Sequence, residues 1–343
     1  MTVPRPVPAA PLHVAVTLDF PASFIERVRA VDERVVVHHH PVEDREEELP
    51  APVLAATEVL YTSAVLPGPG AAPALRWVQL DTSGVDHVRG GALWDSDVVI
   101  TTLGGVSPAP LAEWVLMMVL AHAHHLRDTE ALAARRHWPS PEDRWKLLMP
   151  RDLRRATVGI VGYGSIGREV ARLCQAFGMR VLAVRRDPGS PVGERFGRQP
   201  ELPDVAATGP GGLRDLLAQS DYVVLTVPLT AETEGMIGER ELEAMKPGAV
   251  LVNAGRGGVV DETALVAALD RGQLDRYASD VFATEPLGAD DPLWSHPRAV
   301  VTPHVAGFAP NYLEVVGTLF TENLRRYLDG APLLNLADRG RGY

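Results

Sequence analysis

Short apolar segments alternate with helical patterns and loops along the whole chain. This alternation is typical of an α/β fold with parallel sheets, because each parallel strand needs a crossover before the next one. With 343 residues, and roughly 150 residues per domain, the length predicts two domains. The expected strands are His13–Leu18, Val35–His38, Glu58–Tyr61, Trp77–Leu80, Val98–Thr101, Thr157–Val161, Arg180–Val184, Tyr222–Val227, Ala249–Asn253, Ala278–Val281 and Val300–Thr302.

Charge and composition exclude several classes of protein. The chain has 33 basic and 44 acidic residues, a formal net charge of −11, so nonspecific binding to nucleic acid is not expected. The longest apolar run, Trp114–Ala121, is far shorter than the roughly 20 residues of a membrane span. Cys174 is the only cysteine, so no internal disulfide can form, and we expect a soluble protein of the reducing cytoplasm. The histidine runs near residues 38 and 122 have no cysteine or carboxylate at ligand spacing, so no metal site is predicted.

A glycine-rich turn lies between an expected strand and an expected helix. The strand Thr157–Val161 runs into Gly162-Tyr-Gly164-Ser-Ile-Gly167, and the helix Arg168–Phe177 follows. In this position the first glycine permits the tight turn, the second lets a pyrophosphate approach the backbone, and the third lets helix and strand pack closely. The helix N-terminus adds free N–H groups and a partial positive charge. The turn therefore predicts a dinucleotide site.

Three further polar segments each follow an apolar strand. Ligands of open α/β sheets bind at the carboxyl ends of the strands, so these segments should lie beside the glycine turn. They bring together an arginine that can hold a carboxylate, a histidine that can exchange a proton, and a glutamate that favours the imidazolium and orients the ring. The segments are Asn253–Asp261 with Arg256, Asp280–Pro286 with Glu285, and Thr302–Gly307 with His304.

These segments resemble those of the D-isomer-specific 2-hydroxyacid dehydrogenase family. The resemblance runs over nearly the whole chain and also includes Pro228–Thr233 and Met245–Gly248. It implies an NAD(P)-dependent reductase of small 2-oxo acids that forms D-2-hydroxy acids. Arg256 would bind the substrate carboxylate and polarise the C2 carbonyl, His304 would be the general acid and base, and Glu285 would hold His304.

The resemblance also implies the remaining binding residues. Backbone N–H groups of Ser83, Gly84 and Val85 would grip the substrate carboxylate, and Asp280 would contact the nicotinamide carboxamide. The residues expected to contact the cofactor are Gly162, Gly164, Ser165, Ile166, Gly167, Arg185, Arg186, Val227, Ala254, Gly255, Arg256, Asp280, His304 and Gly307.

The family further implies two Rossmann-like domains. Residues 107–308 would form the dinucleotide-binding domain, a doubly wound parallel sheet. Residues 1–106 and 309–343 would form a discontinuous, flavodoxin-like substrate domain. The apolar helix expected from Leu111 to about Arg127 matches the family's dimerisation helix and predicts a homodimer, although burial in the core of one chain would give the same pattern.

The residues that follow the strand Arg180–Val184, the second strand of the expected dinucleotide-binding domain, favour NADP over NAD. In NAD-specific members an acidic residue follows this strand and binds the ribose 2′-hydroxyl. Here Arg185 and Arg186 follow Val184, and a guanidinium pairs with a 2′-phosphate rather than with a hydroxyl donor. Asp187 could serve the ribose instead, so NAD remains an alternative.

Two other functions fit the same residues. One is a phosphoglycerate dehydrogenase-like enzyme, and the other is a nucleotide-sensing protein like the corepressors that share this fold. Loss of NADPH or NADH absorbance with 2-oxo acids would separate an enzyme from a sensor.

Overall fold

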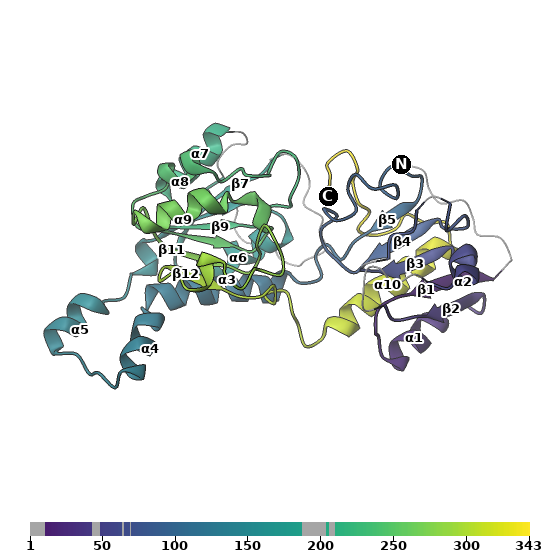
Figure 1. Ribbon diagram of the computed structural model, residues 1–343, viewed down its shortest axis with the longest axis horizontal. Helices are drawn as coiled ribbons and strands as arrows, with labels where there is room; N and C mark the ends of the chain where they lie inside the picture. Colours follow the sequence, from purple (N-terminus) through teal and green to yellow (C-terminus); the bar gives the residue numbers. More distant parts are fainter. Residues whose placement is uncertain (1–10, 43–48, 64, 69, 187–203, 206–209) are drawn as a thin grey trace. The chain divides into compact units, whose positions relative to one another are not determined.

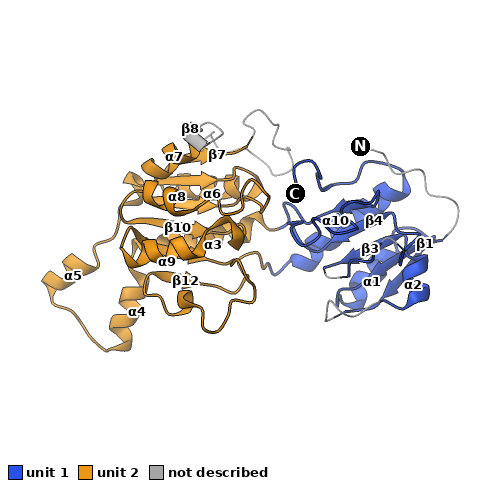
Figure 2. Cartoon of the chain, turned by 45° about the horizontal axis from the view of Figure 1, so that its top comes forward, with its two compact units in different colours: residues 1–106, 309–343 blue, residues 107–308 orange. Residues whose placement is uncertain are grey.

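The computed structural model describes residues 11–42, 49–63, 65–68, 70–186, 204–205 and 210–343. The chain forms two compact units, Met1–Val106 with Ala309–Tyr343 and, as an insertion between them, Ser107–Phe308 (Figure 2). Each unit is built on its own parallel sheet. Within the described residues, no helix is both long and apolar enough to cross a bilayer.

The first unit has a five-stranded sheet in the order β2-β1-β3-β4-β5, with every neighbouring pair parallel. This is the flavodoxin-like order of a doubly wound sheet. The strands are β1 (Leu12–Val16), β2 (Val35–His39), β3 (Val59–Thr62), β4 (Trp77–Leu80) and β5 (Val99–Thr101), and the helices are α1 (Ala22–Arg29), α2 (Ala51–Ala56) and α10 (Tyr312–Leu328).

Helix α10 completes the core of the first unit although it comes last in the chain (Figure 1). Phe320 packs its ring 4.6 Å from that of Tyr61 in β3 and 5.4 Å from that of Trp77 in β4. Gly330, with φ +67°, follows the helix and takes the left-handed conformation that commonly ends helices.

The second unit has a seven-stranded parallel sheet in the order β12-β11-β10-β9-β6-β7-β8. If β6 is counted as the first strand, β8-β7-β6-β9-β10-β11 gives the Rossmann order 3-2-1-4-5-6, with β12 added at one edge. The predicted fold class is confirmed. The strands are β6 (Thr157–Val161), β7 (Arg180–Val184), β8 (Asp204–Val205), β9 (Tyr222–Leu225), β10 (Ala249–Asn253), β11 (Leu274–Ser279) and β12 (Ala299–Val301).

Helices cover both faces of this sheet, which explains its nearly continuous apolar strands. On one face, Val158, Val224 and Val252 pack with α3 and α6; on the other, Val223 and Leu251 pack with α7, α8 and α9. The helices are α3 (Pro108–Ala123), α4 (Leu126–Ala134), α5 (Pro141–Leu147), α6 (Ser165–Ala176), α7 (Pro210–Gln219), α8 (Glu239–Ala244) and α9 (Glu262–Asp270), with short 3₁₀ turns η1 (Leu153–Arg155), η3 (Gly257–Val259) and η4 (Pro292–Trp294).

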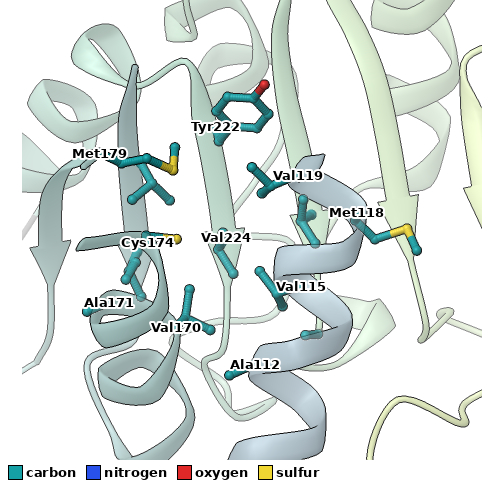
Figure 3. Close-up of a cluster of buried hydrophobic side chains, with 14 of the residues drawn as sticks. Ala112, Val115, Met118, Val119, Val170, Ala171, Cys174, Met179, Tyr222 and Val224 are labelled. Atoms are coloured by element: carbon teal, nitrogen blue, oxygen red, sulfur yellow. The ribbon is translucent and has the colours of Figure 1, made fainter. Parts of the chain in front are cut away.

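Helix α3 ends earlier than expected. The apolar pattern predicted one helix from Leu111 to about Arg127, but α3 stops at Ala123, and His125 takes a left-handed conformation with φ +53° before α4 begins. Ala112, Val115 and Val119 point into the core beside α6 (Figure 3). Much of the apolar pattern of α3 is therefore explained by burial within one chain.

Two other expectations also need correction. β11 begins at Leu274 rather than near residue 278, because its polar start is stabilised by hydrogen bonds from His122 and Arg151 to the Asp275 carboxylate, at 2.8 and 2.7 Å. The glycine and proline content of Pro188–Pro210 predicts a surface loop, but this region contains the short strand β8. Residues 188–203 and 206–209 lie outside the described residues.

Candidate active site

The glycine turn follows β6 directly and has the geometry that its sequence predicts. Gly162 has φ +102°, and a Cβ on it would lie 2.9 Å from the backbone nitrogen of Val227. A Cβ on Gly167 would lie 2.2 Å from the carbonyl oxygen of Gly162. At Gly164, in contrast, a Cβ would have no described atom within 4 Å. The first and third glycines are thus required by packing, and the second leaves open space above the backbone.

Two backbone donors at this turn have no acceptor in the described part of the chain. No described residue accepts a hydrogen bond from the N–H of Tyr163 or Gly164. Ser165 and Ile166 begin α6, and the first N–H groups of a helix have no partner within it. Free N–H groups at a helix N-terminus bind phosphate well, so the turn fits a dinucleotide pyrophosphate.

Basic side chains gather beside the turn. Arg185 follows β7, and the N–H of Gly162 donates to the carbonyl of Val184 at 2.9 Å, which places the end of β7 at the turn. Burial and the nearby Arg185 lower the pKa of Arg168, whose Nε donates to the carbonyl of Gly164 at 3.2 Å. The positive charges of Arg168 and Arg185 repel each other, so an anion of high charge would be stabilised here.

The second predicted arginine has a protein partner. Arg186 is exposed and forms an ion pair of 2.9 Å with Glu232. Asp187, the alternative ribose-binding residue, lies outside the described residues.

The arginine segment follows β10 and is held by the last residue of that strand. Asn253 is fully buried; its Oδ1 accepts from the N–H of Gly255 at 3.1 Å and its Nδ2 donates to the carbonyl of Arg256 at 3.1 Å. A Cβ on Gly257 would lie 1.8 Å from the carbonyl carbon of Phe282. The backbone that carries Arg256 therefore packs directly against the backbone that leads to Glu285.

Glu285 and His304 form a hydrogen-bonded pair. His304 Nδ1 lies 2.7 Å from Oε2 of Glu285, whose Oε1 accepts from the N–H of Phe282 at 2.9 Å. An ionised carboxylate can only accept, so the proton of this bond belongs to Nδ1. Nε2 of His304 is then the ring nitrogen available to a ligand.

Asp280 builds the loop that carries His304. The carboxylate is 1% exposed and accepts hydrogen bonds from the Thr302 hydroxyl at 2.6 Å and from the N–H groups of Val305 and Ala306 at 2.9 and 2.8 Å. The N–H of His304 donates to the Asp280 carbonyl, and His304 itself has φ +54°. Asp280 thus stabilises a left-handed conformation that is uncommon for a residue other than glycine. Its contact with the nicotinamide remains a prediction.

Other predicted cofactor residues lie on the same strand ends. Val227 and Ala254 follow β9 and β10, and a Cβ on Gly255 would lie 2.7 Å from the carbonyl oxygen of Val227. Gly307 lies just after the His304 loop. The structure therefore places the predicted cofactor residues of the second unit at the carboxyl edge of one sheet, where α/β folds bind nucleotides.

In the first unit, the loop that the sequence predicts to bind the substrate carboxylate follows β4 directly. No described residue accepts a hydrogen bond from the N–H of Ser83, Gly84 or Val85. The loop is held in shape by two bonds, from the Thr82 hydroxyl to the Gly84 carbonyl at 2.8 Å and from the Ser83 hydroxyl to the Leu103 carbonyl at 3.2 Å. Consecutive free N–H groups form a concave site for an anion.

Comparisons with known proteins agree with this geometry. Residues 116–306 match the family model described as the NAD-binding domain of D-isomer-specific 2-hydroxyacid dehydrogenases. A glyoxylate reductase of Thermococcus gammatolerans is 35% identical over 261 residues, which are 76% of this chain and 75% of that protein. The chain belongs to the D-isomer-specific 2-hydroxyacid dehydrogenase family.

Two solved structures of this family are also similar. A family member from Xanthobacter autotrophicus, solved with NADPH and MES, is 28% identical, with a TM-score of 0.80 over 98% of this chain and all of that one. An NADPH-dependent glyoxylate/hydroxypyruvate reductase from Sinorhizobium meliloti, solved with NADP and sulfate, is 27% identical, with a TM-score of 0.77 over 97% of this chain and all of that one. The predicted family and enzyme class are confirmed.

Sequence reasoning missed three residues near these sites. Glu262 accepts from the N–H of Ala283 at 2.9 Å, and its pKa is raised by burial and by the charges of Asp291 and Glu285. Arg168 directly follows the glycine turn, and Asp81 directly precedes the loop of Ser83. Asp81 could have been predicted, because a carboxyl directly after a mostly apolar strand indicates a candidate functional residue.

Proposed function

We propose that this dehydrogenase reduces a small 2-oxo acid, such as glyoxylate or hydroxypyruvate, to the D-2-hydroxy acid. The observation that carries the proposal is the 2.7 Å pair of Glu285 and His304, because the loop that leads to Glu285 packs against the Arg256 segment. A proton donor of defined orientation beside a carboxylate-binding cation suits the reduction of a 2-oxo acid.

Each residue of this group has a distinct role. Reduced nicotinamide, when bound, supplies a hydride to C2. His304 gives the proton on Nε2 to the carbonyl oxygen, and Glu285 stabilises the imidazolium before transfer and orients the ring. Arg256 binds the substrate carboxylate and polarises the carbonyl, and the N–H groups of Ser83–Val85 bind the same carboxylate. In the oxidation direction His304 accepts the proton.

A panel of 2-oxo acids tests this function. The absorbance of NADPH should fall when the enzyme is mixed with glyoxylate, hydroxypyruvate or a bulkier branched or aromatic 2-oxo acid. If no member of the panel is reduced with NADPH or NADH while both cofactors bind, the chain is a nucleotide sensor and not a reductase.

We propose NADP as the cofactor, held by the free N–H groups of the glycine turn and, at its 2′-phosphate, by Arg185. Arg186 would assist from its exposed position at the same strand end. The repulsion between the charges of Arg168 and Arg185 supports a binding site for a dianion. A phosphate bound between two guanidinium groups relieves that repulsion.

Arg185→Ala should weaken NADPH binding by about 10- to 100-fold, the size of one lost charge-assisted hydrogen bond, and leave NADH binding unchanged. Dissociation constants from NADPH and NADH fluorescence measure this on the enzyme without substrate. Arg172→Ala, which removes an exposed arginine of α6 that pairs with Glu169, is the matched control. An equal loss for both cofactors would show that Arg185 does not bind the 2′-phosphate.

We also propose that two copies associate through the outer side of α3 and the arm that follows it. The arm of α4 and α5 extends away from the sheet of the second unit (Figure 1), and neither helix has a buried residue. Trp138 and Trp145 in this arm are 82% and 73% exposed. With Leu147 and Met149, which are also exposed, they give this region an extended apolar surface, and such surfaces mark sites of protein association.

Light scattering should give twice the chain mass at micromolar concentration. Replacement of Trp138 and Trp145 by lysine should lower the mass to that of one chain, because charges replace apolar contacts. Phe177→Lys, at an exposed aromatic residue after α6, should leave the mass unchanged. A wild-type mass of one chain would refute the dimer.

A further inference from the structure

Asp81 places a carboxyl group immediately before the loop of Ser83–Val85. It is the first residue after β4. Its Oδ1 accepts a hydrogen bond of 2.8 Å from the Tyr61 hydroxyl in β3, and its carboxyl is also hydrogen-bonded to Tyr312, the first residue of α10. Among the described residues, these two tyrosines are the titratable groups that act on the carboxyl, and no cation offsets its charge.

The surroundings of Asp81 make its charge sensitive to pH near neutrality. Burial raises the pKa of Asp81 to about 6, and the two tyrosine hydroxyls act in the opposite direction, because they stabilise the carboxylate. Below this value the group is mostly neutral, and above it the group carries a full negative charge.

Asp81 is two residues from Ser83, the first residue of the loop with free N–H groups. Consecutive Cα atoms are 3.8 Å apart, so the Cα atoms of Asp81 and Gly84 are separated by about 11 Å at most. A unit charge at about 8 Å, with an effective dielectric constant of about 40, weakens the binding of an anion by about fivefold. Salt screens such a pair only in part, since the Debye length is about 8 Å at physiological ionic strength.

We propose that Asp81 sets the pH range in which the loop Ser83–Val85 binds the substrate carboxylate. Neutral Asp81 leaves the N–H groups of the loop to the substrate, and ionised Asp81 repels the substrate carboxylate. This inference rests on the proposed role of the loop in binding a 2-oxo acid.

The test compares KM for glyoxylate from pH 5 to pH 8 in the wild type and in Asp81→Asn. Asparagine keeps an oxygen that can accept from Tyr61 and Tyr312 but has no charge. The ratio of wild-type to variant KM should be about 1 at pH 5 and rise to about 5 at pH 7.5, while kcat stays similar. The ratio removes effects of pH that both proteins share, including those on His304.

Asp97→Asn is the matched control. Asp97 is an exposed carboxylate that precedes β5 at the opposite edge of the same sheet, so its KM should follow the wild type at every pH. A ratio near 1 for Asp81→Asn at all pH values would overturn the inference, and so would an equal rise of KM at all pH values, which indicates a purely structural role.

Tyr312→Phe should raise the pKa of Asp81 further. Loss of this hydroxyl removes a donor that stabilises the carboxylate, so the rise of KM should move to higher pH. If KM of Tyr312→Phe depends on pH as that of the wild type does, and the KM ratio for Asp81→Asn stays near 1, the ionisation of Asp81 does not control substrate binding.

Two further measurements do not need activity. Because folded Asp81 keeps a proton that the unfolded chain releases near pH 4, the contribution of Asp81 to wild-type stability should fall as pH rises from about 4 to 6. The Tm of Asp81→Asn should therefore equal that of the wild type at pH 4 and exceed it above pH 6. An equal Tm for the two proteins at all pH values would show that Asp81 does not titrate as proposed.

Calorimetry with oxalate as the anion separates this inference from the proposed function. At pH 7.5 oxalate should bind Asp81→Asn about fivefold more tightly than the wild type. If no 2-oxo acid is reduced, the proposed function fails, and oxalate alone decides the inference: a fivefold difference supports it, and equal affinities or no binding at pH 5 refute it.

Discussion

His304→Ala should lower kcat for the best 2-oxo acid by about 10³-fold. The variant lacks the group that protonates the carbonyl oxygen, and general acid catalysis contributes about 10²- to 10⁴-fold. Steady-state rates with NADPH measure the loss. NADPH affinity should change much less than kcat, because the glycine turn that would bind the pyrophosphate is not altered, even though His304 is itself an expected cofactor contact.

His296→Ala is the matched control for this variant. His296 also pairs with a carboxylate, Asp270, at 3.3 Å, but it lies outside the group of Arg256, Glu285 and His304, so kcat should stay within about twofold of the wild type. Arg256→Ala should also lose most activity, through a large rise in KM. Near-normal turnover in His304→Ala would refute the proposed mechanism.

Gly257→Ala should destabilise the second unit and abolish most activity. The new Cβ would lie 1.8 Å from the carbonyl carbon of Phe282 and 2.2 Å from its oxygen, and backbone atoms cannot yield as a flexible side chain can. Overpacking of this kind costs about 3 kcal/mol or more, which for a unit of this size corresponds to a fall in Tm of about 6 to 12 °C. Thermal unfolding and kcat/KM measure the two effects.

Gly288→Ala serves as the control for that substitution. A Cβ at Gly288 would meet no described atom within 4 Å, so Tm and activity should match the wild type. If Gly257→Ala were as stable and active as Gly288→Ala, the two backbones would not be in the contact described.

Much of the fold could be predicted because its strands are buried on both faces. β4, β6, β7 and β10 begin and end at the residues that their apolar runs predict. The start of β11 could not be predicted, because Asp275 is stabilised by residues more than 100 positions away in sequence. Similarly, no glycine or proline marks the left-handed turn at His125 between α3 and α4.

Motifs and the family resemblance supply the proposed site residues, but the contacts that hold these residues in place could not be predicted. The resemblance assigned roles to Arg256, Glu285 and His304, which lie in three separate segments of the sequence. The three hydrogen bonds that Asp280 accepts from the His304 loop depend on the pairing of β11 with β12, and the sequence contains no local signal for them. The position of Tyr312 against Asp81 likewise depends on how α10 packs on the first sheet.

The place of α10 in the chain has a consequence for biosynthesis. The first sheet is complete by Thr101, yet Val316, Phe320 and Leu324, which cover its core, are made only after the whole of Ser107–Phe308. Domains generally fold as units during synthesis, so the inserted unit can reach its native state on the ribosome while the first sheet still exposes Tyr61 and Trp77. A released chain that ends before residue 312 should therefore have a folded inserted unit and an N-terminal segment that chaperones recognise.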